Sequence, residues 1–273
     1  FGVEKVFSDY RLMLDETRPD GVFILVSHFE TFRVASECLR RKIPCLIEKP
    51  AGLMSEETAE LAKLAEDNHC LNMVALNRRF IFTIQVAFAY ILERGPLVGI
   101  VINAPEAIRR IRAVSRHDPR LYDNWLIANN IHAIDLFRCL GGEVEGIESF
   151  RNSREEPNGD SFTSIMRLDK CCLGTYTSHW NSAGGWSLEL FGEGIKAEIS
   201  LSNYAAIIYR GKKQLTISPN PVDKLFNPGL YAQNQTFVNA LALDENLGYP
   251  ASDLADSTKT MKLIEMILKG KTN

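Results

Sequence analysis

Two short stretches of this sequence hold residues that could carry acid–base chemistry. In the first, the apolar run 45–47 stops on Glu48, Lys49 and Pro50. A short apolar run that ends near a proline is typical of a buried parallel strand, and open α/β sheets bind ligands beyond the carboxyl ends of such strands. Lys49 is therefore expected at a ligand site. The alternative is an ordinary strand end with a solvated Glu–Lys pair.

The second stretch covers residues 129–135 and begins a predicted helix that ends near 141–142. His132 and Asp135 lie three residues apart, so they share one face beside the apolar stripe of that helix. An asparagine cap just before His132 would put it in the first turn, where the helix dipole disfavours an imidazolium. We expect a neutral imidazole that can accept a proton. The alternative is a partly buried histidine that bonds Asp135 for structural reasons.

Strands and helices alternate through the first 80 residues, as in a doubly wound parallel sheet. We predict helices over 9–17, 31–41 and 55–67, the last capped by Ser55, and buried strands over 22–26, 45–49 and 73–76.

The pattern changes after residue 80 to one dominated by short strands. A helix is predicted over 83–94 and a strand over 98–104. Further strands are predicted over 144–152, 162–168, 173–180, 186–191, 195–201, 205–209 and 214–217, with turns at 157–160 and 183–185, and helices over 231–243 and 252–269. Such a series favours an antiparallel sheet with helices on one face and the other face free. We therefore predict an α/β plus α+β chain with domains at 1–80 and 81–273, the C-terminal helices packing back on the first domain.

These pieces, in this order, resemble the glucose-fructose oxidoreductase and inositol dehydrogenase family of NAD(P)-dependent enzymes. The motifs are Glu48-Lys49-Pro50 after a strand and His132-x-x-Asp135 on a helix about 80 residues later, a separation that makes the combination more specific than either part. Residues 20–26 and 77–80 extend the resemblance. It implies an incomplete Rossmann-like sheet, a substrate domain with a large open sheet, NAD or NADP as cofactor, and a cis bond before Pro50.

The resemblance also implies roles for individual residues. His132 would be the general base, Lys49 would donate hydrogen bonds to the reacting oxygen of a sugar-like substrate, and Asp135 would be the third catalytic group. The expected cofactor contacts are Glu48, Lys49, Pro50, Asn77 and Arg78, and the weaker substrate candidates are Asn129, Asn130, His179 and Trp180.

The sequence departs from the family pattern at two places. No Gly-x-Gly-x-x-Gly occurs, although a dinucleotide-binding domain opens with that phosphate-binding turn. We expect that the N-terminal part of the domain, which would contain this turn, is missing from the sequence rather than from the molecule. Ala128 stands where the family has an aspartate, so Asn129, Asn130 or Asp135 would have to replace its function.

Other functions fit the same residues. Without the phosphate-binding turn, the chain could be a noncatalytic sugar-binding relative or subunit, and the family also contains NAD-assisted glycoside hydrolases. The basic stretch Arg109, Arg110, Arg112 and Arg116 is either a solvated edge or a clamp for a substrate phosphate or carboxylate.

Composition excludes several classes of protein. The 273 residues carry a net charge of −3 and are 45% hydrophobic, which gives no reason to expect nucleic-acid or membrane partners. Six scattered cysteines are typical of reduced thiols in a cytoplasmic protein, and no spacing predicts a metal site. An open sheet with an uncovered face favours a homodimer or homotetramer.

Overall fold

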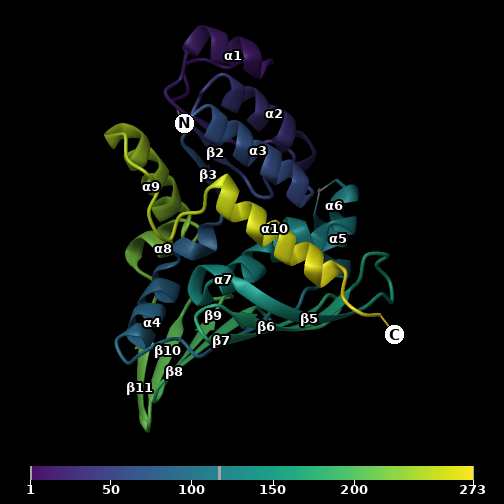
Figure 1. The fold of residues 1–273 in the computed structure, drawn as a ribbon, viewed down its shortest axis with the longest axis vertical. Coiled ribbons are helices and arrows are strands. Elements are labelled where there is room, and N and C mark those ends of the chain that lie inside the picture. The colour runs from purple at the N-terminus through teal and green to yellow at the C-terminus, as the bar shows by residue number, and fades with distance from the viewer. Residues whose placement is uncertain (1, 116–117, 273) are drawn as a thin grey trace.

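A computed structural model describes residues 2–115 and 118–272 of the chain, and its first part is a small parallel sheet (Figure 1). Strands β1 (Val22–Ile24), β2 (Cys45–Ile47) and β3 (Asn72–Val74) pair in the order β1-β2-β3. Helices α1 (Tyr10–Thr17), α2 (His28–Arg40) and α3 (Ser55–Asp67) alternate with these strands. The carboxyl end of β2, where the Lys49 motif begins, therefore lies in the middle of the sheet.

The second part is an eight-stranded sheet with the order β11-β10-β9-β8-β4-β7-β6-β5. Its strands are β4 (Gly99–Asn103), β5 (Val144–Asn152), β6 (Ser161–Leu168), β7 (Cys172–His179), β8 (Ser187–Gly192), β9 (Ile195–Ser200), β10 (Ala206–Arg210) and β11 (Lys213–Ile217). All neighbours are antiparallel except β4 and β7, which run parallel. The turn at 183–185 therefore does not close a hairpin, because β4 lies between β7 and β8.

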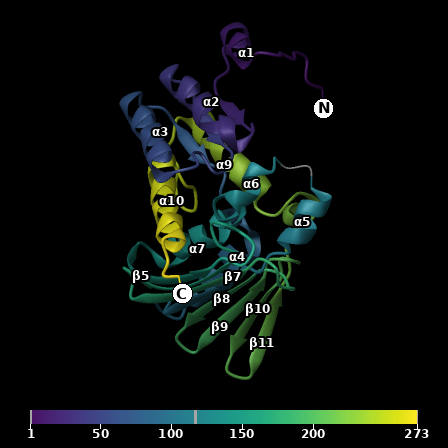
Figure 2. The same ribbon diagram turned by 90° about the vertical axis from the view of Figure 1, so that its right-hand side faces the viewer.

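Helices cover one face of this large sheet (Figure 2). α4 (Phe82–Leu92), α7 (Ile131–Gly141) and α10 (Leu254–Leu268) pack against its strands, and α10 also packs along α3 of the first part. The remaining helical segments are η1 (Asn77–Phe80), α5 (Ile108–Val114), α6 (Arg120–Asp123), η2 (Leu126–Asn130), α8 (Pro221–Leu225) and α9 (Leu230–Leu243). The predicted fold class is confirmed, although α5, α6, α8, η1 and η2 were not predicted.

α7 is the central element, since every one of its residues is buried. It lies between the large sheet below and α10 with η1 above (Figure 1). A helix enclosed on all sides places each polar side chain against a defined neighbour, because buried polar groups need partners. This enclosure fixes where His132 and Asp135 can point.

Three local predictions were wrong. β1 is only partly buried: it pairs with β2 alone, and Phe23 is 42% exposed although Ile24 is buried. Ser55 is not a cap but the first helical residue, and its hydroxyl donates to Glu265 of α10 over 2.9 Å. No asparagine caps α7, because the π-helical turn η2 runs directly into it and takes the place of a free N-terminus.

The described ranges contain no helix long and apolar enough to span a bilayer. Within the same ranges, no group of three or more histidine, cysteine or acidic side chains is arranged to hold a metal ion. All six cysteines are free thiols, and five of them are buried.

Candidate active site

The structure brings the two predicted motifs together. The Lys49 ammonium, beyond the end of β2, donates a 2.5 Å hydrogen bond to the backbone carbonyl of Ala128 in η2, one turn before His132. The charge of Lys49 also acts directly on the His132 imidazole. An ammonium has three donors, so Lys49 can bond Ala128 and a substrate oxygen at the same time.

Burial controls the protonation of both groups. It is the main cause that lowers the pKa of His132 well below its usual value, and the charges of Lys49 and Arg78 lower it further. Burial also lowers the pKa of Lys49, against the opposing charge of Glu48. His132 is therefore neutral near pH 7, as predicted, but the cause is burial and neighbouring cations rather than a helix dipole.

Arg78 links this pair to a pocket of the large sheet. Its guanidinium lies 3.8 Å from the centre of the Trp186 ring, and its buried Nη1 has no hydrogen-bond partner. Burial lowers the pKa of Arg78 to about 10, while the charge of Glu106 opposes this effect. Arg78 is thus a half-buried cation with one buried, unused donor.

A pocket of about 390 Å³, here called the β4 pocket, opens beside Arg78. Its polar lining comes from Arg78, Glu106, Arg110, Asn129, Trp186 and Ser202. Glu106 is 6% exposed and accepts a 2.5 Å hydrogen bond from the side-chain amide of Asn129. Burial raises the pKa of Glu106 to about 7, despite the opposing hydrogen bond from Asn129.

Sequence reasoning missed Glu106 and Trp186. Glu106 could have been found, because it is an acid just beyond the predicted strand 98–104. Lys49 was selected as a candidate for the same position after its own strand. Trp186 follows two glycines and was read only as the start of a strand, so its contact with Arg78 could not be anticipated. Lys49 and His132 themselves do not line the β4 pocket.

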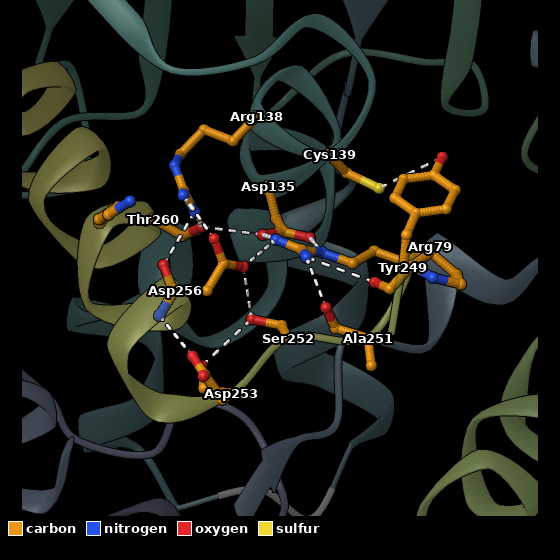
Figure 3. Close-up of polar contacts among 12 residues, drawn as sticks. Arg79, Asp135, Arg138, Cys139, Tyr249, Ala251, Ser252, Asp253, Asp256 and Thr260 are labelled. Carbon is orange, nitrogen blue, oxygen red and sulfur yellow. Dashed lines mark hydrogen bonds and ion pairs between the residues drawn. The ribbon is translucent and has the colours of Figure 1, made fainter. Parts of the chain in front are cut away.

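The predicted catalytic role of Asp135 needs correction, because its carboxylate is fully engaged elsewhere (Figure 3). It accepts two 2.6 Å bonds from Arg79 and one of 2.8 Å from Thr260. Arg138 and Asp256 complete this buried network. Asp135 therefore joins α7 to η1 and α10 and does not bond His132, whose buried Nδ1 has no partner.

The pKa of Asp256 shows that this network favours the ionised form of that carboxylate. Burial alone would raise its pKa, but the charges of Arg79 and Arg138 outweigh burial and hold it at about 2. The two buried guanidinium groups are thus matched by the carboxylates of Asp135, Asp256 and Glu143, which is the condition under which buried charges are tolerated.

The predicted cofactor contacts occupy the end of β2 and the start of η1. Pro50 is buried after a cis peptide bond, as the resemblance implied, and burial raises the pKa of the neighbouring Glu48. Asn77 donates to the carbonyl of Pro228 over 2.9 Å, so its side chain holds the chain before α9 and is not directed at a ligand.

The weaker substrate candidates separate into two groups. Asn129 lines the β4 pocket, and Asn130 is fully buried with its amide 3.3 Å from the Ser178 hydroxyl. His179 is exposed, and Trp180 is a core residue packed on Phe162. Neither of these two lines the β4 pocket, because strand alternation turns His179 outward and the Trp180 ring is enclosed.

The arginines of the basic stretch differ in their partners. Arg109 pairs with Glu155, and Arg112 pairs with Glu156 over 2.7 Å. Arg110 lines the β4 pocket. Arg116 lies outside the described residues.

Comparison with known proteins identifies the first part of the chain. Residues 1–76 match the sequence profile described as an oxidoreductase family with an NAD-binding Rossmann fold. This match agrees with the expected family over residues 1–76, the first part of the chain. The uncharacterized protein YMR315W of Saccharomyces cerevisiae is 21% identical over 250 residues, which cover 86% of this chain and 71% of the yeast protein.

Solved structures extend the likeness of fold to nearly the whole chain. UDP-N-acetylglucosamine 3-dehydrogenase GnnA from Acidithiobacillus ferrooxidans superposes with a TM-score of 0.79 and 20% identity, over 96% of this chain and 81% of that one. A levoglucosan dehydrogenase in complex with NADH and levoglucosan gives 0.82 and 17%, over 98% and 82%. Both parts of the present fold thus occur together in dehydrogenases.

Proposed function

We propose that this chain is an NAD(P)-dependent dehydrogenase that oxidises a CH–OH group of a sugar, a sugar derivative or a cyclitol. The observation that carries the proposal is the meeting of Lys49 and His132, 83 residues apart in the sequence, at the start of the buried helix α7. The structural relatives named above act on a nucleotide sugar and on levoglucosan, which supports the substrate class.

The nicotinamide end of the cofactor fits the residues present. Lys49 and Pro50 lie beyond the carboxyl end of β2, where open sheets bind nucleotides, and buried donors with unused capacity lie next to them. When bound, the cofactor supplies the hydride acceptor. The described residues contain no glycine-rich turn for its pyrophosphate, so the proposal for this chain concerns the nicotinamide end alone.

The chain's own residues would manage one proton. The neutral His132 imidazole accepts the proton of the substrate hydroxyl, since a ring nitrogen of a neutral imidazole has a free lone pair. Lys49 donates a hydrogen bond to the same oxygen and stabilises its developing negative charge. Burial of His132, and then the charges of Lys49 and Arg78, lower the pKa of the imidazole and keep it unprotonated before the reaction.

The test is an assay of hydride transfer from a panel of sugars and cyclitols to NAD⁺ or NADP⁺. The absorbance of the reduced nicotinamide measures the rate. Lys49→Met and His132→Asn should each lower kcat by about 10²- to 10⁴-fold. Lys63→Met and His69→Asn change an exposed lysine and an exposed histidine outside the proposed site and serve as matched controls. Undiminished rates in both site variants would reject the assigned roles, and sugar binding without turnover would favour the noncatalytic alternative.

We also propose that the free face of the large sheet joins copies of the chain into a homodimer or homotetramer. Phe150, Ile165 and Leu173 project from that face and are 49–60% exposed. Light scattering on wild-type protein and on an Ile165→Glu variant tests this, because a charge among these exposed apolar side chains should shift the mass to that of a monomer. The free thiols support a reducing, cytoplasmic location.

A further inference from the structure

The β4 pocket contains more positive charge than the reaction at Lys49 and His132 requires. Arg78 and Arg110 both line it, and Lys49 lies close enough to act on Arg78. The carboxyl group that lines it is Glu106, and its raised pKa of about 7 makes it only partly ionised near neutral pH. An uncharged sugar would leave this excess of positive charge unbalanced.

Arg110 differs from its neighbours on α5. Arg109 and Arg112 each pair with a glutamate, whereas Arg110 makes no hydrogen bond or ion pair with any described residue. Its guanidinium is exposed and lines the pocket. Of these three arginines, Arg110 is therefore the one whose charge is available to a ligand.

Arg78 supplies the second, independent observation. Arg78 is half-buried, one face of its guanidinium is covered by Trp186, and its Nη1 is a buried donor without a partner. A buried guanidinium nitrogen without an acceptor is costly unless a ligand provides one. A planar guanidinium fits the paired oxygens of a carboxylate or phosphate better than it fits a single hydroxyl.

The wall opposite α5 is built closely enough to hold such a group in place. Gly185 packs so tightly against the Ser202 side chain that there is no room for a Cβ atom, and Gly184 has a φ of +119°. This turn leads directly into Trp186, whose side chain is 9% exposed. This wall of the pocket is thus formed by the backbone of a tight turn and by Trp186, opposite the side chain of Arg110.

We propose that the β4 pocket binds the anionic substituent, a carboxylate or a phosphate, of an acidic sugar derivative through the guanidinium groups of Arg78 and Arg110. Glu106, held by Asn129, accepts a hydrogen bond from a neighbouring hydroxyl of the same ligand. The inference rests on the proposed function for its sugar, and it names the class of substrate that the Lys49–His132 pair receives. The anion would also balance the charge of Lys49 and of an oxidised nicotinamide.

Binding can be measured without turnover, because two of the three tryptophans, Trp125 and Trp186, interact with Glu106 at the pocket. Tryptophan fluorescence would be titrated with D-glucuronate, D-glucose 6-phosphate and uncharged D-glucose, with inorganic phosphate as a simple anion. The two acidic sugars separate a carboxylate from a phosphate ligand. We expect at least one of them to bind about tenfold more tightly than glucose, since each charge-assisted pair contributes roughly that factor.

Matched variants assign the effect to the pocket. Arg110→Gln removes an exposed side chain, so the fold should persist; it should weaken binding of the acidic sugar about tenfold and leave glucose binding unchanged. Arg109→Gln removes the same charge one residue away, outside the pocket, and should change neither. Equal binding of glucose and both acidic sugars, or an equal loss in the two arginine variants, would overturn the proposal.

The outcome can be separated from that of the proposed function. Protein that binds an acidic sugar through Arg110 but transfers no hydride with either cofactor supports the pocket and counts against the dehydrogenase. Protein that oxidises uncharged sugars with a KM unaffected by Arg110→Gln supports the dehydrogenase and overturns the anion site.

Discussion

Glu106→Gln should change how stability depends on pH, because it removes one buried titrating group and keeps its shape. Burial raises the pKa of Glu106 from the ordinary 4.5 to about 7, which means that the folded protein favours the protonated form. The stability due to this group is fully present below pH 4.5. It is lost as the pH rises through 7.

The magnitude follows from the two pKa values. One pKa unit corresponds to 1.36 kcal/mol, so the difference between 4.5 and about 7 amounts to about 3 kcal/mol. The wild-type protein should lose this free energy of unfolding between about pH 4.5 and pH 8, relative to the variant. Glutamine still offers an oxygen to the Asn129 amide, so the hydrogen bond at 2.5 Å has a counterpart in the variant.

The assay is urea or thermal unfolding of both proteins at several pH values from about 5 to 8. All other groups titrate in both proteins, so the difference between the two curves isolates Glu106. The advantage of the variant should grow by about 3 kcal/mol with rising pH, or roughly 6 °C in Tm. Glu93→Gln, which removes an exposed acid, controls for the change in net charge. Parallel curves over the whole range would refute the reasoning.

Two further substitutions test the packing that holds the site. Asp135→Ala leaves Arg79 without its buried partner and should lower the free energy of unfolding by about 3 kcal/mol in urea, whereas the double variant Arg79→Met/Asp135→Leu should lose less. Gly229→Ala places a Cβ on the Asn77 carbonyl at a φ of +77° and should cost more than about 2 kcal/mol, while Gly211→Ala, at a φ of +58° in open space, should cost about 1 kcal/mol by the same measurement.

The order of helices and strands was readable in the sequence because their periodicities are local. Around Lys49 and His132, the spacing of apolar residues shows which faces of the strand and of the helix are buried. This spacing can be read directly from the sequence. Boundaries were less exact: η2 was missed since a π-helical turn has no distinct composition, and its presence removed the predicted cap of α7.

The partners of buried polar groups were not readable. Nothing near Asp135 in the sequence indicates that Arg79, 56 residues earlier, would take both of its oxygens rather than His132. The same holds for Arg78 and Trp186, which lie 108 residues apart in the sequence and meet only because folding brings η1 next to the residue before β8.

The sequence by itself therefore determined the fold class, the likeness of its first part to an NAD-binding oxidoreductase family, and the two motifs that supply a lysine and a neutral histidine. Only the tertiary structure decided which charged groups act on Lys49 and His132. It also decided that Asp135 stabilises the packing of α7, and that Glu106 and Arg110 line one pocket. The physical reason is range: hydrophobic periodicity is a property of adjacent residues, whereas electrostatics and hydrogen bonding in a buried site depend on segments that folding brings together.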